Sequence, residues 1–483
     1  MLCCELHHTG RVRWQVRSRA GKASFISLIQ SLVRCALGAS ACLVETAILA
    51  GPASAAGFGN DYQGARAVGA ASAGAASAAD ATTIFYNPAG LTYLDTNQIV
   101  AGGELFLLRD QFVNEGSTIL GGAIPTPGPS GPNAIPPILV PWLYGTYRLN
   151  PELSVGVGIF APFGLRTDYG PEWVGRYQNE VSALTAINFN PSIAYRPTSW
   201  LSAGLGLDVQ YVNIRLSSAV DFGSACVAAL GPAPCAGGFG LQPGGSDGQA
   251  DLSGESIGFG FNLGVLVEPQ PGTRIGLAYR SGIEQNFGRI KESFGVPSNA
   301  RAFLAAGRAP FTLTGSNASA SLQLPGRVSL ALKQTVSDKL DLLLDVTLTL
   351  WGVLQSVGVV AATPTTGVSP VIPFDYRNAW RFAGAVEYRI AEPWSVRGGV
   401  AYDQTPIPLS AVQASLPDRD RVYISAGVSF RATRSLSIDM GYSHIIYAGG
   451  AIPINRTSPN GDTILGKFNV GGNIVAAQLK FEY

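Results

Sequence analysis

Apolar and polar residues alternate with a period of two through most of the chain from residue 98 onward. In the range 201–211, every odd position is apolar and every even position is Ser, Gly, Asp or Gln. The ranges 421–430 and 435–442 repeat the pattern. Because successive side chains of a β-strand point to opposite faces, this pattern predicts strands with one apolar and one polar face.

The lengths of the connections between these strands restrict the fold further. When the expected strands are counted along the chain, the connections that follow the second, fourth and later even-numbered strands have only a few residues. The connections that follow the odd-numbered strands are much longer. Short turns at one end and long loops at the other are typical of transmembrane barrels, and a soluble sandwich has no reason to separate them. The sequence predicts an all-β fold, a 14-stranded antiparallel transmembrane β-barrel over residues 98–483. The expected strands are 98–109, 139–149, 152–166, 180–196, 200–215, 254–268, 273–288, 318–336, 339–352, 376–390, 394–404, 420–431, 434–447 and 469–483.

The ends of the strands support a membrane location. Aromatic residues near strand ends are expected to form the girdles at the two membrane surfaces. The last strand alternates up to the terminal aromatic residue Tyr483, which resembles the signal read by barrel-assembly machinery, a partner expected during biogenesis. The expected girdle residues are Tyr211, Tyr279, Tyr388, Trp394 and Tyr442.

Composition agrees with a barrel and argues against membrane helices. Charged residues make up 13% of the chain, against about 25% in an average soluble protein. The most apolar long stretch after residue 56, Leu340–Ala362, contains Asp341 and Asp345 and is rich in β-branched residues. The formal net charge of +1 gives no general attraction to nucleic acid.

The N-terminus has the features of an export signal. A basic region is followed by an apolar core over 35–49 and by Ala53-Ser54-Ala55, a signal-peptidase pattern. We therefore assign residues 1–55 to a signal peptide and expect the mature protein in the bacterial outer membrane. The basic region is unusually long, which leaves open a start of translation downstream of Met1.

Two of the 6 cysteines, Cys226 and Cys235, lie in the mature chain. They are nine residues apart in a Gly/Pro-rich loop, and export places them in an oxidising compartment. We expect a small disulfide-closed loop there; two free thiols remain the alternative.

Residues 56–97 differ from the rest of the chain. The part from Gly64 to Ala81 is almost entirely Gly, Ala and Ser, and apolar residues such as Phe85 and Leu91 follow it. This is more apolar mass than a disordered linker usually carries. We therefore predict a small N-terminal plug, or hatch, in the lumen of the barrel.

A motif within this segment carries a family resemblance. The sequence from Ala67 to Leu91 resembles the plug of FadL/TodX-type outer-membrane transporters, which take up long-chain fatty acids or aromatic hydrocarbons. Within this stretch, Pro88 holds the preceding Asn87 in an extended conformation, and the Asn87 amide can bind neighbouring backbone groups. The resemblance runs from about Gly57 to Tyr483; the long signal region and the cysteine loop depart from it. The motif residues are Asp80, Asn87, Pro88, Ala89 and Gly90.

The resemblance implies capture of substrate by extracellular loops, passage into the barrel and sideways release through its wall. The third expected strand offers a physical cause for an opening, since a proline cannot donate a ladder hydrogen bond and a glycine permits a kink. We hypothesise a lateral opening at Pro162, Phe163 and Gly164. The alternative is a strand that simply ends at Ala161.

A fatty acid requires an apolar tunnel and a cation for its carboxylate. Strand parity gives several inward cations, most of which can pair with inward acids. The candidate head-group ligands are Arg215 and Arg381. The candidate apolar ligand contacts are Phe160, Trp351 and Tyr423.

Other functions fit the sequence less well. An outer-membrane hydrolase needs a histidine base, and the mature chain has only His444, with no accompanying nucleophile or metal-ligand cluster. We expect no enzyme activity, no metal and no cofactor. A general porin needs no plug. We expect a monomer that contacts outer-membrane lipid and binds a hydrophobic small molecule; fatty acid against aromatic or alkane hydrocarbon stays open.

Overall fold

The computed structural model describes residues 57–307, 317–361 and 371–483. The expected signal peptide, residues 1–55, lies outside these ranges. No described helix is long and apolar enough to cross a membrane.

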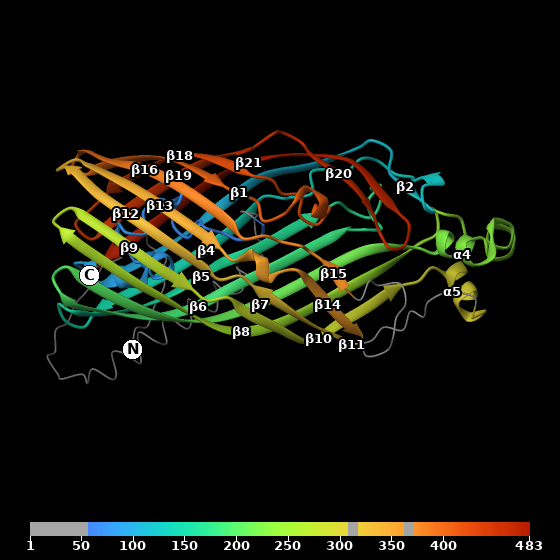
Figure 1. The fold of residues 1–483 in the computed structure, drawn as a ribbon, viewed down its shortest axis with the longest axis horizontal. Helices are drawn as coiled ribbons and strands as arrows, with labels where there is room; N and C mark the ends of the chain where they lie inside the picture. The colour runs from blue at the N-terminus through green and yellow to red at the C-terminus, as the bar shows by residue number, and fades with distance from the viewer. Residues whose placement is uncertain (1–56, 308–316, 362–370) are drawn as a thin grey trace, which may run out of the picture. The chain divides into compact units, whose positions relative to one another are not determined.

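The described strands close into an antiparallel barrel, because β1 pairs with both β4 and β21. This confirms the predicted 14-stranded barrel, in which three of the wall strands are each divided into two shorter ones (Figure 1). The wall consists of β1 (Gln98–Asn114), β4 (Ile138–Arg148), β5 (Leu153–Asp168), β6 (Val181–Thr198), β7 (Leu201–Asp221), β8 (Asp247–Gln270), β9 (Thr273–Arg280) with β10 (Ile283–Gly295), β11 (Asn317–Leu324) with β12 (Arg327–Ser337), β13 (Leu340–Thr349) with β14 (Ser356–Ala361), β16 (Ala379–Ala391), β17 (Trp394–Asp403), β18 (Arg421–Arg431), β19 (Leu436–Tyr447) and β21 (Thr463–Glu482).

The three divided strands correct the expectation of continuous strands over 273–288, 318–336 and 339–352. Pro325-Gly326 separates β11 from β12, and Pro325 has no N–H for the ladder. A Cβ on Gly326 would lie 2.8 Å from the carbonyl oxygen of Arg280, so the two broken strands approach closely here. The 3-10 helix η3 (Trp351–Val353) separates β13 from β14.

Smaller elements lie at the end of the barrel that carries the long loops. The helices α4 (Phe222–Leu230) and α5 (Ser298–Ala305) lie beyond this end, on the right of Figure 1. The short strands are β2 (Thr118–Ile119), β3 (Ile124–Pro125), β15 (Val371–Pro373) and β20 (Ile452–Thr457); the short helices are η2 (Pro234–Phe239) and η4 (Leu409–Ala411).

The two faces of the wall differ as the alternation predicts. On β8, the outward side chains of Ile257 and Phe259 are exposed, the latter to 74%. On β7, the inward side chains of Asp208 and Gln210 are buried. The exposed face is apolar and suits lipid, whereas the inner face is polar and packs against other protein groups.

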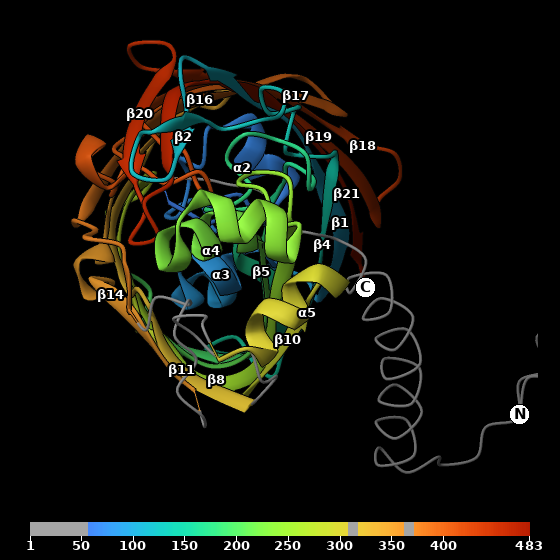
Figure 2. The same cartoon turned by 90° about the vertical axis from the view of Figure 1, so that its right-hand side faces the viewer.

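Residues 57–97, the N-terminal segment, lie within the ring of strands (Figure 2). The segment contains α2 (Ala65–Gly69), α3 (Thr83–Tyr86) and the 3-10 helix η1 (Pro88–Tyr93). η1 packs against β6, β7 and β8, and α2 packs against β18 and β19. The core of the molecule is therefore formed between this segment and the inner face of the wall.

Candidate functional site

β5 loses its neighbour on one side halfway along its length. It pairs with β4 from Ser154 up to Ile159 and no further. Its pairing with β6 on the other side shifts register between Phe160 and Phe163, which marks a bulge. The strand nevertheless continues to Asp168, so the alternative of a strand that ends at Ala161 is wrong. The structure places Pro162 inside a strand at an edge that β4 leaves free.

The beginning of the N-terminal segment, residues 57–62, occupies this edge, and we call it the tip. The backbone N–H of Asn60 donates to the carbonyl of Pro162 at 2.8 Å, and the N–H of Gly164 donates to the carbonyl of Phe58 at 2.7 Å. Gly59 and Phe163 face each other as an antiparallel bridge. The tip thus replaces β4 beside the bulge.

A cavity lies behind the bulge, and its lining includes Pro162, Phe163, Trp351 and Pro325. The ring of Phe58 packs edge-on against Trp351, with 4.8 Å between centroids. The rings of Phe163 and Trp351 lie 6.0 Å apart. The cavity is therefore bounded by an aromatic cluster of the tip, β5 and η3.

Two arginines also line this cavity, Arg280 and Arg327. An Nη of Arg327 lies 2.6 Å from a carboxylate oxygen of Asp61 in the tip, and Arg280 pairs with the buried Asp208. The guanidinium carbons of Arg280 and Arg327 lie 5.1 Å and 5.2 Å from the ring centroid of Phe85. Each cation thus has an acid partner, which is Asp61 of the chamber for Arg327 and Asp208 outside the lining for Arg280, and both have Phe85 as an aromatic neighbour.

The candidate Arg381 lies beneath the tip. Its Nη2 donates to the hydroxyl of Tyr62 and to the carbonyl of Ala71, each at 3.1 Å. Its Nη1 lies 3.2 Å from Asp403, and its guanidinium carbon lies 4.7 Å from the ring centroid of Tyr423. Arg381 and Tyr423 are buried together, next to the chamber but outside its lining.

The other candidates divide between the chamber and the outside. Trp351 lines the chamber, and the buried Phe160 packs against Phe85 with 5.2 Å between ring centroids. Arg215 is wrong as a lumen ligand: its side chain is 61% exposed and lies 3.8 Å from Asp251. Arg215 is odd-numbered, like the outward residues of β7, so the alternation of side chains along the strand points it away from the lumen.

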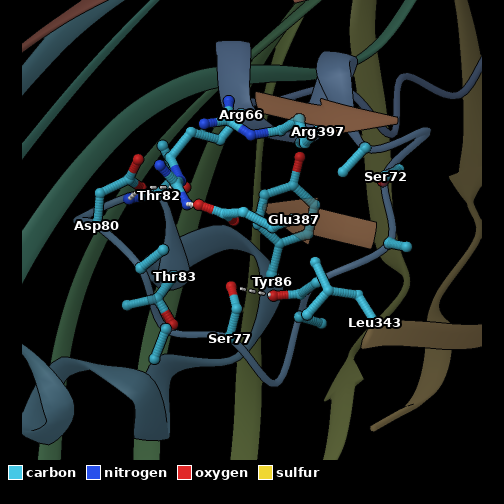
Figure 3. A pocket seen from close by; sticks show the side chains of 17 residues that line it. Arg66, Ser72, Ser77, Asp80, Thr82, Thr83, Tyr86, Leu343, Glu387 and Arg397 are labelled. Atoms are coloured by element: carbon cyan, nitrogen blue, oxygen red, sulfur yellow. Dashed lines mark hydrogen bonds and ion pairs between the residues drawn. The ribbon is translucent and has the colours of Figure 1, made fainter. Parts of the chain in front are cut away.

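Asp61 and Arg66 of the N-terminal segment were not among the candidates, although both form ion pairs with the wall. Arg66 binds Glu387 through two hydrogen bonds of 2.7 Å and lies 3.3 Å from Asp439. Figure 3 shows Arg66 next to Arg397 above the Glu387 carboxylate, in a pocket between the segment and the wall. Because Asp61 and Arg66 do not lie in a strand, parity gave no signal for them.

The Asn-Pro-Ala motif fixes the segment to one side of the wall. The side chain of Asn87 accepts from the N–H of Ala89 at 3.1 Å and donates to the carbonyls of Val265 and Leu277 at 3.1 Å and 3.3 Å. A Cβ on Gly264 would lie 2.0 Å from the Asn87 amide oxygen, so only glycine fits at this position. Pro88, Ala89 and Gly90 are buried within η1.

A second glycine contact lies on β17, β18 and β19. A Cβ on Gly441 would lie 2.4 Å from the carbonyl oxygen of Ala65, and one on Gly427 would lie 2.9 Å from the Cα of Gly69. Asp80 adds a polar contact, since its carboxylate accepts from the Gln478 amide at 2.8 Å. We call residues 64–94 the anchored part, because they pack closely against glycines on two sides of the wall.

The helices α4, η2 and α5, which we call the cap, have their own small core. Cys226 and Cys235 form a disulfide, and both are buried with Phe222 and Phe303 in one apolar cluster. α5 begins directly after Pro297, and no side chain caps its first turn. The described residues hold no group of three or more His, Cys, Asp or Glu placed to bind a metal.

Known proteins resemble the chain over most of its length. The family model for the outer membrane protein transport protein family (OMPP1/FadL/TodX) matches residues 46–483. A long-chain fatty acid transport protein of Escherichia coli is 28% identical over 84% of this chain and 90% of its own length.

Two solved structures share the fold. A FadL homologue of Pseudomonas aeruginosa has a TM-score of 0.78 and 23% identity over 88% of this chain and 100% of its own. The Ralstonia pickettii toluene transporter TbuX has a TM-score of 0.61 and 20% identity over 87% and 98%. With the barrel and the matched family model, these findings show that the chain belongs to the OMPP1/FadL/TodX family of outer membrane transport proteins.

Proposed function

We propose that this transporter takes up long-chain fatty acids passively and binds their carboxylate head group at the chamber behind the β5 bulge, which has a volume of about 30 Å³ while the tip is in place. The observation that carries this proposal is that Arg280 and Arg327 line the same chamber as an aromatic cluster. An apolar chamber with a few convergent cations is what an amphipathic carboxylate requires. A neutral hydrocarbon has no charged group that these arginines could bind.

In this mechanism, Asp61 holds the place of the ligand in the empty transporter. Its carboxylate lies against Arg327 and within 3.8 Å of Arg381. An incoming fatty-acid carboxylate competes with Asp61 for Arg327, since an arginine favours carboxylate partners of matching geometry. The competition couples ligand binding to movement of the tip.

Release occurs sideways at Pro162–Gly164. Among the described residues, the tip supplies the pairing of Pro162–Gly164 on the β4 side, so its displacement exposes an opening in the wall between β4 and β5. The acyl chain leaves toward the membrane, and the anchored part keeps the bore plugged against water.

Capture precedes these steps at the extracellular cap, where α4 lies in front of the barrel opening in Figure 2. The cap exposes Ala228, Ala229 and Ala302 around its apolar core. These small apolar residues offer a landing surface for an acyl chain.

Binding of oleate and of oleyl alcohol to the purified protein in detergent tests the proposal. Arg327→Gln is expected to weaken oleate by about tenfold, the equivalent of one contact of about 1.4 kcal/mol, and to leave oleyl alcohol unchanged. Arg389→Gln, at an exposed arginine outside the chamber, is the matched control. Heat-modifiable gel migration checks that each barrel is folded.

An aromatic hydrocarbon channel of the same family is the second candidate, favoured by the rings of Phe58, Phe163 and Trp351. Unchanged oleate binding in Arg327→Gln and Arg280→Gln, together with saturable toluene binding, would decide for it. A steady ion conductance of the wild type in planar bilayers would instead indicate a general porin.

A further inference from the structure

A groove with a volume of about 450 Å³ opens on the outside of the barrel where β1 meets β21. β4 pairs with β1 only as far as Phe106, so the next residues of β1 have no wall strand on that side. The chain around Asn133 runs alongside instead and forms a bridge with Gln111. The volume is within the range of small-molecule sites, about 300–1,000 Å³.

Gly471 keeps the groove open. A Cβ built on Gly471 meets no atom within 4 Å, so the space above it is empty. The exposed side chains of Leu107 and Pro137 supply its outward apolar lining. The body of the groove therefore suits a hydrocarbon chain.

The groove lies near the outer surface of the membrane. Gln98, the first residue of β1, lies at the end of the barrel with the short turns, and Arg109 is eleven residues further along the strand. With a rise of about 3.4 Å per residue and a tilt of about 40°, Arg109 lies about 29 Å higher, just above an apolar band about 25 Å tall. This is the level at which the head groups of the outer leaflet begin.

The polar groups of the groove favour an anion. Arg109 is exposed, donates to the Gln111 amide oxygen at 2.7 Å and forms no ion pair within the described ranges. Asn473 accepts from Tyr442 at 2.7 Å and lies 2.9 Å from Nδ1 of His444. No acidic residue of the described chain lines the groove. Its upper rim therefore carries positive charge without a carboxylate to neutralise it.

We propose that this groove binds a phosphorylated lipid of the outer leaflet. The lipid phosphate binds Arg109, and an acyl chain lies against Leu107 and Pro137 in the space above Gly471. The transported substrate is a different occupant, because the chain at Ala134 separates the groove from β5: its N–H donates to Asp110, and its carbonyl accepts from Asp168. The site faces the membrane and not the lumen.

Native mass spectrometry of the protein incubated with bis-phosphorylated lipid A in mild detergent tests this proposal. The wild type is expected to retain one lipid A molecule. Arg109→Gln removes the charge, and Gly471→Leu fills the groove without meeting the wall; each is expected to lower occupancy by about tenfold. The matched controls are Arg215→Gln, at another exposed outward arginine, and Gly288→Leu, at a β10 glycine whose Cβ also meets nothing within 4 Å.

Equal retention of lipid A by Arg109→Gln, Gly471→Leu and the wild type would overturn the proposal. Displacement of the lipid by oleate at equal concentration would do so as well, since it would assign the groove to the transport path. Heat-modifiable migration identifies any variant that fails to fold, and the two variants perturb the groove independently.

Discussion

The tip and the anchored part of the N-terminal segment are held in different ways. The anchored part packs its Asn87 and Pro88 side chains against Gly264 and its main chain against Gly441, where a Cβ on either glycine would clash. The tip is held by two backbone hydrogen bonds to β5 and by the ion pair of Asp61 with Arg327. Close packing cannot be loosened in small steps, whereas hydrogen bonds and an ion pair can be exchanged for a ligand. One segment can therefore plug the bore and still move at one end.

A cross-link that holds the tip is expected to have the largest effect. Gly59 and Phe163 form an antiparallel bridge, a geometry that places two cysteines within disulfide reach. Oxidised Gly59→Cys/Phe163→Cys protein should lose uptake of radiolabelled oleate and regain it after reduction.

The matched control cross-links the anchored part. The hydroxyls of Thr92 and Ser202 lie 2.8 Å apart, so Thr92→Cys/Ser202→Cys joins η1 to β7. Uptake should stay at the wild-type level in this variant. Equal inhibition by both cross-links would show that the two parts do not differ.

Displacing the anchored part should open the bore. Gly264→Val forces a side chain into the Asn87 amide, an overpacking that costs about 1–3 kcal/mol. We expect a steady conductance in planar bilayers that the wild type lacks. Gly145→Val is the control, because a Cβ there meets its nearest neighbour at 3.9 Å. A closed Gly264→Val barrel would contradict anchoring by the glycine contact.

Removing the Asp61 carboxylate, which competes with the ligand for Arg327, should increase the affinity for oleate. Asp61→Asn leaves Arg327 without its carboxylate partner, so oleate should bind about tenfold more tightly, by about 1.4 kcal/mol. Isothermal titration with oleate and with oleyl alcohol separates charge from packing. A gain for both ligands would point to a general loosening of the tip.

The smallest effect is expected at the end of the anchored part. The ring of Tyr93 lies between the guanidinium groups of Arg196 and Arg274, 4.2 Å and 3.7 Å from their central carbons. Tyr93→Leu should lower the thermal stability by about 1–2 kcal/mol, the worth of two cation–π contacts, and leave oleate uptake unchanged. A loss of uptake would assign Tyr93 a part in transport.

Alternation predicted the barrel well, because one residue of misregister would turn a whole face from lipid to lumen. It failed where the backbone is not a regular strand. The breaks at Pro325-Gly326 and η3 interrupt segments whose apolar pattern continues through them. The tip has no period at all, so Asp61 could not be matched with Arg327 from sequence.

The candidate site was predictable only in part for the same reason. Pro162 and Gly164 stand out in a strand by their chemistry alone, and Trp351 by its size. The chamber itself arises where three interrupted strands, a bulge and the tip meet, which depends on contacts between residues far apart in the chain. Arg215 shows the opposite error, since parity already placed it outward.

The pairing of β1 with β21 has a consequence for biogenesis. The two strands zip together from Gln98↔Glu482 to Asn114↔Gly466, and β1 directly follows the segment that fills the bore. A cylinder sealed along this seam offers no sideways entrance to a folded plug. The pairing of β21 with β1 is therefore the step that encloses the segment within the ring of strands.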